Sequence, residues 1–116
     1  MQILINTDNN VEGRDELAHL VEATVRTALS RFSDQITRVE AHLGDESAGR
    51  PTGDDKRCML EARVGGRAPV AVTNYADTLE KAFHGAADKL KRLLESEFGR
   101  LDDRKGGASI RGTEQR

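Results

Sequence analysis

The sequence predicts an α+β fold in which one four-stranded mixed sheet has two helices packed on one face. Three observations lead to this prediction. Four short segments alternate apolar and polar side chains, as half-buried strands do, and two longer segments repeat apolar residues at helical spacing. The segments follow one another in the order β-α-β-β-β-α. Every segment is apolar on one side only, so we expect two layers that enclose a single core.

The N-terminal half contains two of the strands and one helix. Residues 2–6 alternate, and residues 7–10 are a turn rich in Asp and Asn, which bond to their own backbone. A helix is expected over 14–32 and a second strand over 36–43. The two strands should be parallel because a helix connects them. The helix has an apolar stripe that consists of Leu17, Val21, Thr24, Val25, Ala28 and Phe32.

The C-terminal half contains a hairpin and the longest helix. Residues 57–64 and 70–73 alternate on either side of Gly65-Gly66, and adjacent glycines permit positive φ at both corners of a tight turn. Pro69 cannot donate a hydrogen bond, so the strand that it precedes is expected at the sheet edge. The last helix is expected over 77–101. Its buried stripe consists of Leu79, Phe83, Ala86, Leu90, Leu94, Phe98 and Leu101.

We expect residues 1–103 to form a single domain and residues 104–116 to be a disordered tail of small and polar residues. No stretch approaches the roughly 18 apolar residues of a membrane span, so no membrane association is expected. The N-terminus runs directly into a strand pattern, which predicts that no export signal is present. The one cysteine, Cys58, excludes an internal disulfide and is typical of a reducing cytoplasm. It alternates in phase with the apolar residues of its strand and should therefore be buried.

The residues that could carry chemistry are scattered. His19, His42 and His84 lie on three different elements without ligand spacing, and no motif places a base beside Cys58. The loop 44–56 contains Asp45, Glu46, Asp54 and Asp55 but lacks the ligand order of a calcium loop. We therefore predict that the chain is not an enzyme and has no metal, no cofactor and no small-molecule substrate.

The charge is unevenly distributed. The net charge is −2, which argues against a general nucleic-acid binder, because phosphate neutralisation needs an excess of Lys and Arg. Residues 1–56 have 6 basic and 11 acidic side chains, which gives −5, whereas residues 57–116 have 12 and 9, which gives +3. An anion-binding surface is therefore expected in the second half.

One side of the last helix has an acid-free strip. At 100° per residue, a single line along the helix contains Lys81, Gly85, Lys89, Arg92, Ser96 and Arg100, here called the cation strip. Four cations over about 30 Å of helix could follow a phosphate backbone. The alternative is an ordinary solvated helix, in which Asp88–Arg92 and Lys91–Glu95 are i,i+4 ion pairs worth a few tenths of a kcal/mol.

Residues 88–94, Asp-Lys-Leu-Lys-Arg-Leu-Leu, are similar to the "D/N-K-L-x-R-x-L" signature on the last helix of a known family, and Ala82-Phe83 matches the apolar pair before it. Together with the element order, these motifs mean that residues 1–101 resemble the hibernation-promoting factor and ribosome-associated inhibitor family, once called sigma-modulation proteins. The resemblance implies a monomeric cytoplasmic stress factor that binds small-subunit rRNA in the mRNA and tRNA channel and represses translation. By matching position it implies rRNA contacts for Lys89, Arg92 and Arg100. Lys81 is added from the cation strip.

The chain departs from the family pattern at positions that reduce positive charge. Glu80 stands where a Tyr is usual, Ser96 where a basic residue is frequent, and the loop 44–56 is long and acidic. The chain also ends without the C-terminal domain of long members and resembles the short form. These departures leave a second hypothesis open. In it, the chain is a diverged adaptor of the same fold that binds a protein through its acidic loop or its exposed sheet face.

Overall fold

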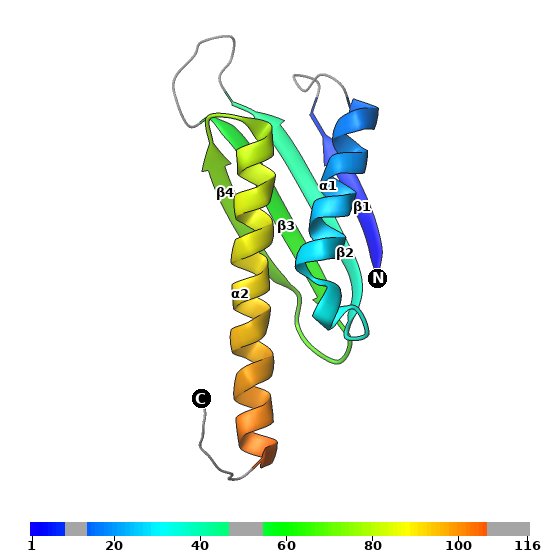
Figure 1. Cartoon of the computed structure of the whole chain (residues 1–116), viewed down its shortest axis with the longest axis vertical. Coiled ribbons are helices and arrows are strands. Elements are labelled where there is room, and N and C mark those ends of the chain that lie inside the picture. The colour runs from blue at the N-terminus through cyan, green and yellow to red at the C-terminus, as the bar shows by residue number, and fades with distance from the viewer. Residues whose placement is uncertain (9–13, 47–54, 107–116) are drawn as a thin grey trace.

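The predicted order of elements is confirmed. The computed structural model describes residues 1–8, 14–46 and 55–106, including their side chains except those of Arg14 and residues 99–106. A short 3₁₀ turn, labelled η1, is the one element in these ranges that the sequence did not predict. The elements of Figure 1 are β1 (Gln2–Thr7), α1 (Arg14–Ala28), η1 (Ser30–Phe32), β2 (Ile36–Asp45), β3 (Lys56–Val64), β4 (Val70–Ala76) and α2 (Leu79–Gly106).

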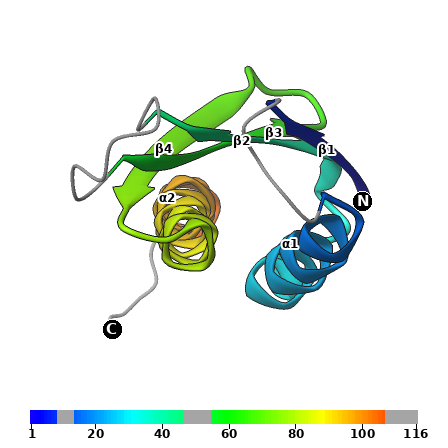
Figure 2. The ribbon, with the colours of Figure 1, turned by 90° about the horizontal axis from the view of Figure 1, so that it is seen from above.

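The strands form one mixed sheet in the order β1-β2-β3-β4. β1 is parallel to β2, as expected for a helical connection, whereas the other two neighbouring pairs are antiparallel. Both helices lie on the same face of this sheet, and none of the described residues forms a helix on the opposite face (Figure 2). The predicted α+β class and the predicted edge position of β4 are therefore confirmed.

The ends of the elements differ from the prediction. α1 stops at Ala28 rather than at Phe32, because the chain tightens into a 3₁₀ turn in which Phe32 N–H donates to the Leu29 carbonyl over 2.9 Å. This tighter turn brings Phe32 into the core, where it is 4% exposed. At the other helix, the hydroxyl of Thr78 accepts from the Lys81 N–H over 3.1 Å and so caps the first turn. α2 continues to Gly106, beyond the predicted end at Leu101.

The hairpins are also longer than predicted. β2 extends to Asp45, which pairs with Lys56 of β3, so the first part of the expected loop is strand. In the turn from β3 to β4, the Arg67 N–H donates to the Val64 carbonyl over 3.1 Å. Only Gly66 of the two central glycines has a positive φ, 74°, which is typical of a type II turn rather than of the expected two-glycine corner.

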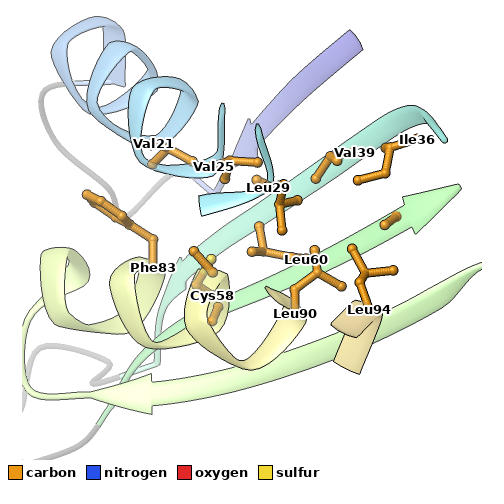
Figure 3. Close-up of a cluster of buried hydrophobic side chains, with 14 of the residues drawn as sticks. Val21, Val25, Leu29, Ile36, Val39, Cys58, Leu60, Phe83, Leu90 and Leu94 are labelled. Carbon is orange, nitrogen blue, oxygen red and sulfur yellow. The ribbon is translucent and has the colours of Figure 1, made fainter. Parts of the chain in front are cut away.

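The core lies between the sheet and the two helices and is almost entirely aliphatic. Figure 3 shows its main side chains. They are Val21 and Val25 on α1, Leu29 directly after α1, Ile36, Val39, Cys58 and Leu60 on the strands, and Phe83, Leu90 and Leu94 on α2. Burial of each large side chain contributes about 1.5–3 kcal/mol. Cys58 is 0% exposed, which confirms the predicted strand register.

Aromatic contacts hold the C-terminal half of α2 against η1 and the β3–β4 turn. Phe98 of α2 stacks on Phe32 of η1 with ring centroids 5.3 Å apart. The guanidinium of Arg31 lies 5.2 Å from the Phe32 ring, and that of Arg67 lies 5.1 Å from the Phe98 ring. Cation–π contacts of this kind are worth about 0.5–1 kcal/mol at exposed sites. The stack therefore joins η1, the β3–β4 turn and α2, and it holds α2 in line along the sheet.

Candidate nucleic-acid interface

A close contact between α2 and β4 sets the direction of the cation strip. The Asn74 side-chain N–H donates to the carbonyls of Ala82, over 3.2 Å, and Lys81, over 3.5 Å. Gly85 makes this possible, because a Cβ at that position would collide with the Asn74 amide. Sequence spacing put Gly85 on an outward line of α2, but it faces β4. The strip therefore runs along the β4 side of the helix.

The three strip cations with described side chains all have partners. Lys81 pairs with Asp77 over 3.2 Å, and Arg92 pairs with Asp88 over 2.9 Å, both at i,i+4 spacing. Lys89 donates to the backbone carbonyl of Thr73 on β4 over 3.0 Å. The side chain of Arg100, the fourth predicted site residue, lies outside the described part of the chain. Asp77 and Asp88 thus bring two carboxylates to a line on which the sequence placed none.

These ion pairs are weak enough to exchange. The side chains of Lys81 and Arg92 are 67% and 75% exposed, and exposed i,i+4 pairs contribute about 0.3–0.5 kcal/mol. A backbone phosphodiester of RNA has one negative charge and two non-bridging acceptor oxygens, as a carboxylate does, and can therefore replace either carboxylate. Three cations and two carboxylates leave a local charge of +1 (3 − 2) along the described strip. The strip can therefore bind a polyanion, though with less charge than the bare sequence suggested.

The predicted alternative pairing on α2 is half correct. Asp88–Arg92 forms, whereas Glu95 pairs with Arg31 of η1 over 3.1 Å instead of with Lys91. Lys91 is consequently a cation without a carboxylate within 4.0 Å among the described residues, as are Arg63 and Lys89. Sequence spacing missed Lys91 because it treated the acidic residues nearby on α2 as its partners.

Lys91 lies in a groove between the two helices. The groove has a volume of about 440 Å³, and Thr24 and Thr27 of α1 line the side opposite Lys91, with Ala87 of α2 also contributing. His84 and Asp88 contribute polar groups from α2. Both threonines are neutral, so α1 places neither a carboxylate nor a second cation in the lining of this groove.

The remaining chemistry-bearing residues do not converge. In the ranges that the structure describes, no group of three or more His, Cys, Asp or Glu side chains could hold a metal ion. Asp45 and Asp55, at the two ends of the acidic loop, lie 3.5 and 2.9 Å from the Lys56 ammonium, and the hydrogen bond that Lys56 donates to Asp55 raises the pKa of that lysine. Residues 47–54 of the loop lie outside the described residues. None of the described helices combines the length and apolar character of a membrane span.

A family profile decides the classification. The profile described as "Sigma 54 modulation protein / S30EA ribosomal protein" matches residues 4–102. The chain belongs to this family. The resemblance seen in residues 88–94 and in the element order is thereby confirmed, and the S30EA description is one of ribosomal proteins rather than of enzymes.

Two solved structures share the fold of this S30EA protein. The N-terminal domain of Thermus thermophilus Protein Y is 22% identical, with a TM-score of 0.67, and the match covers 84% of this chain and 99% of that one. A ribosomal subunit interface protein from Coxiella burnetii is 16% identical, with a TM-score of 0.66, over 85% of this chain and 99% of the other. At these identities the likeness is one of fold. No curated protein sequence gives a significant match.

Proposed function

We propose that this S30EA protein binds the RNA of the small ribosomal subunit and represses translation by occupying the mRNA and tRNA channel. The observation that carries the proposal is the family match over residues 4–102. A relative of the same fold is described as a ribosomal subunit interface protein. On this proposal the protein acts in the cytoplasm, where ribosomes are. Occupation of the channel requires no chemical step, which agrees with the scattered titratable residues described above.

The cation strip is the proposed contact surface. Lys81, Lys89 and Arg92 span 11 residues of α2, or about 16 Å at 1.5 Å per residue, and Arg100 lies two further turns along the helix. RNA phosphates would replace Asp77 and Asp88 as the partners of Lys81 and Arg92. The two carboxylates would then be hydrated instead of paired. Because the strip has few net charges, the affinity should rely on the shape of the folded RNA as well as on counterion release.

Co-sedimentation with small ribosomal subunits at two salt concentrations tests this function. We expect the protein to pellet with the subunits at low salt and to remain in the supernatant at high salt, because phosphate contacts release counterions. The same protein should inhibit translation of a reporter mRNA in a purified system. Failure to pellet at low salt would overturn the proposal.

A specific observation keeps the adaptor hypothesis as the second candidate. On the sheet face that has no helix, Leu4 and Tyr75 are 38% and 49% exposed, and Arg63 has no carboxylate partner in the described part of the chain. Glu40 on the same face joins Arg38 over 2.8 Å and His42 over 3.5 Å. Exposed apolar groups beside fixed charges are typical of protein-binding surfaces. If the protein does not bind ribosomes, this face is where a protein partner should be sought.

A further inference from the structure

The outer edge of β4 is an open row of backbone hydrogen-bonding groups. β4 pairs with β3 on one side, and no strand in the described ranges pairs with its other side. Peptide groups alternate in direction along an antiparallel strand. The Arg67 N–H donates to the Val64 carbonyl across the turn, so Val64 and every second residue before it turn their peptide groups toward β4, and their partners Val70 and Val72 turn theirs toward β3. The N–H and C=O groups of Ala71, Thr73 and Tyr75 therefore point away from β3, and the Thr73 carbonyl accepts from the Lys89 ammonium.

This edge lacks the usual protection against strand addition. Natural edge strands are commonly interrupted by charged residues, proline or a bulge. Val70–Ala76, with the sequence VAVTNYA, has no charge and no proline, and the one register shift of the sheet lies between β2 and β3. The protection comes instead from α2, because the Lys89 ammonium occupies the central carbonyl of the edge, that of Thr73, over 3.0 Å.

We propose that the outer edge of β4 is a pairing surface for a second copy of this chain, and that Lys89 keeps it closed in the free protein. The edge is complementary to itself. An antiparallel pair centred on Thr73 places Thr73 opposite its equivalent and Ala71 opposite Tyr75 of the second copy. All outward N–H and C=O groups of these residues are then used in a symmetric contact.

The position of α2 is compatible with this pairing. α2 packs over both β3 and β4, so its axis lies about one strand spacing, ~4.8 Å, from the two-fold axis of such a pair. The two α2 helices would therefore lie about 10 Å apart, which is the spacing of packed helices. Their facing sides would carry the two cation strips, with Lys89 of each copy near the axis.

Lys89 opposes pairing in two ways. Its ammonium takes the Thr73 carbonyl that the Thr73 N–H of a second copy would need. Two Lys89 side chains near the axis would also repel each other. Removal of this single charge frees the carbonyl and removes the central repulsion, whereas Lys91 lies on the other flank of α2, in the groove between the helices.

Analytical ultracentrifugation of the full chain tests the proposal, with Lys89→Ala as the variant and Lys91→Ala as the matched control. Both variants lose one charge from the same helix. Wild type and Lys91→Ala should sediment as the 12.7 kDa monomer, whereas Lys89→Ala should shift to twice that mass as its concentration rises. In that dimer, the amides of Ala71, Thr73 and Tyr75 should exchange with deuterium more slowly than in the wild type.

A second substitution locates the contact. Thr73→Pro removes an outward N–H and leaves the β3–β4 bonds in place, so Lys89→Ala/Thr73→Pro should return to the monomer with an unchanged circular dichroism spectrum. A Lys89→Ala variant that stays monomeric at all concentrations overturns the proposal. So does a dimer in which the three outward amides still exchange at the wild-type rate, because its contact would lie elsewhere.

Discussion

At the scale of single residues, Cys58 is a core residue rather than a nucleophile. Its side chain is fully buried, and burial raises the pKa of the thiol from 9.0 to about 12, although the neighbouring Arg57 acts in the opposite direction. Thiolate is the reactive form of cysteine. In the folded protein at ordinary pH, the Cys58 sulfur should be inaccessible to reagents and should remain protonated.

Thiol labelling tests this burial. At pH 8 a maleimide should modify Cys58 far more slowly in the native protein than in urea, because the folded chain keeps the thiol both covered and protonated. The matched measurement is the rate in the unfolded chain at the same pH. Equal rates would contradict the strand register, since a slip of one residue would exchange the buried and exposed faces of β3.

Lys89 shows why a single side chain can belong to two surfaces. On sequence grounds it is an exposed cation of the proposed RNA-binding helix. In the structure it also closes the β4 edge through its bond to the Thr73 carbonyl. A change at Lys89 therefore alters both the strip charge and the sheet edge. Lys81 and Arg92, whose partners are exposed carboxylates, are the cleaner positions for testing RNA binding.

At the scale of elements, the contact between Asn74 and Gly85 fixes α2 against β4. A glycine within a helix costs about 1 kcal/mol relative to alanine, so its presence here needs a compensating gain. The gain is the approach of the Asn74 amide, which donates to carbonyls in the first turns of α2. Alanine at position 85 would displace that amide and forfeit these bonds.

A double-mutant cycle measures this coupling. Gly85→Ala in the wild type should fail to stabilise the protein, because the helix gain of about 1 kcal/mol is offset by the lost Asn74 bonds. In an Asn74→Ala background the same change should raise the free energy of unfolding by about 1 kcal/mol. Urea unfolding of the four proteins gives the coupling energy. If Gly85→Ala stabilises both backgrounds equally, the contact does not position the helix.

The elements themselves were largely predictable, but their ends were not. Apolar periodicity identified every strand and both long helices, since one-sided burial dictates the residue at each inward position. The end of α1 depends on Phe32 turning inward to meet Phe98, a ring more than sixty residues away that no local pattern can register. The extension of β2 depends likewise on the pairing of Asp45 with Lys56 across the acidic loop.

The composition of the candidate site was also predictable, whereas its surroundings were not. Helical spacing alone identified the line that contains Lys81, Lys89 and Arg92. It could not show that this line runs beside β4, because that follows from the contacts of Gly85 and Lys89 with a strand that is distant in sequence. It offered the Asp88–Arg92 pair only in the alternative of a solvated helix, and it did not identify Asp77 as the partner of Lys81.

At the scale of the whole molecule, the distribution of charge distinguishes a specific RNA-binding site from non-specific attraction to RNA. The net charge is −2, so non-specific attraction to RNA should be slight, and binding requires cations that are gathered on one surface. On α1, Arg26 forms an i,i+4 pair with Glu22 over 3.1 Å, much as Arg92 does with Asp88. Arg26 and Arg63 of the open sheet face are both exposed, and together they therefore offer a control that is matched in charge.

The most direct test of the central claim compares two double reversals in ribosome co-sedimentation. Lys81→Glu/Arg92→Glu and Arg26→Glu/Arg63→Glu each lower the net charge by four, and circular dichroism should confirm that both fold. We predict that the strip variant loses small-subunit binding and that its log–log salt dependence flattens by about 0.7–0.9 for each lost phosphate contact, whereas the control binds nearly as the wild type does. Equal losses in both variants would contradict the account, because net charge alone would then govern binding and the cation strip would not be a site.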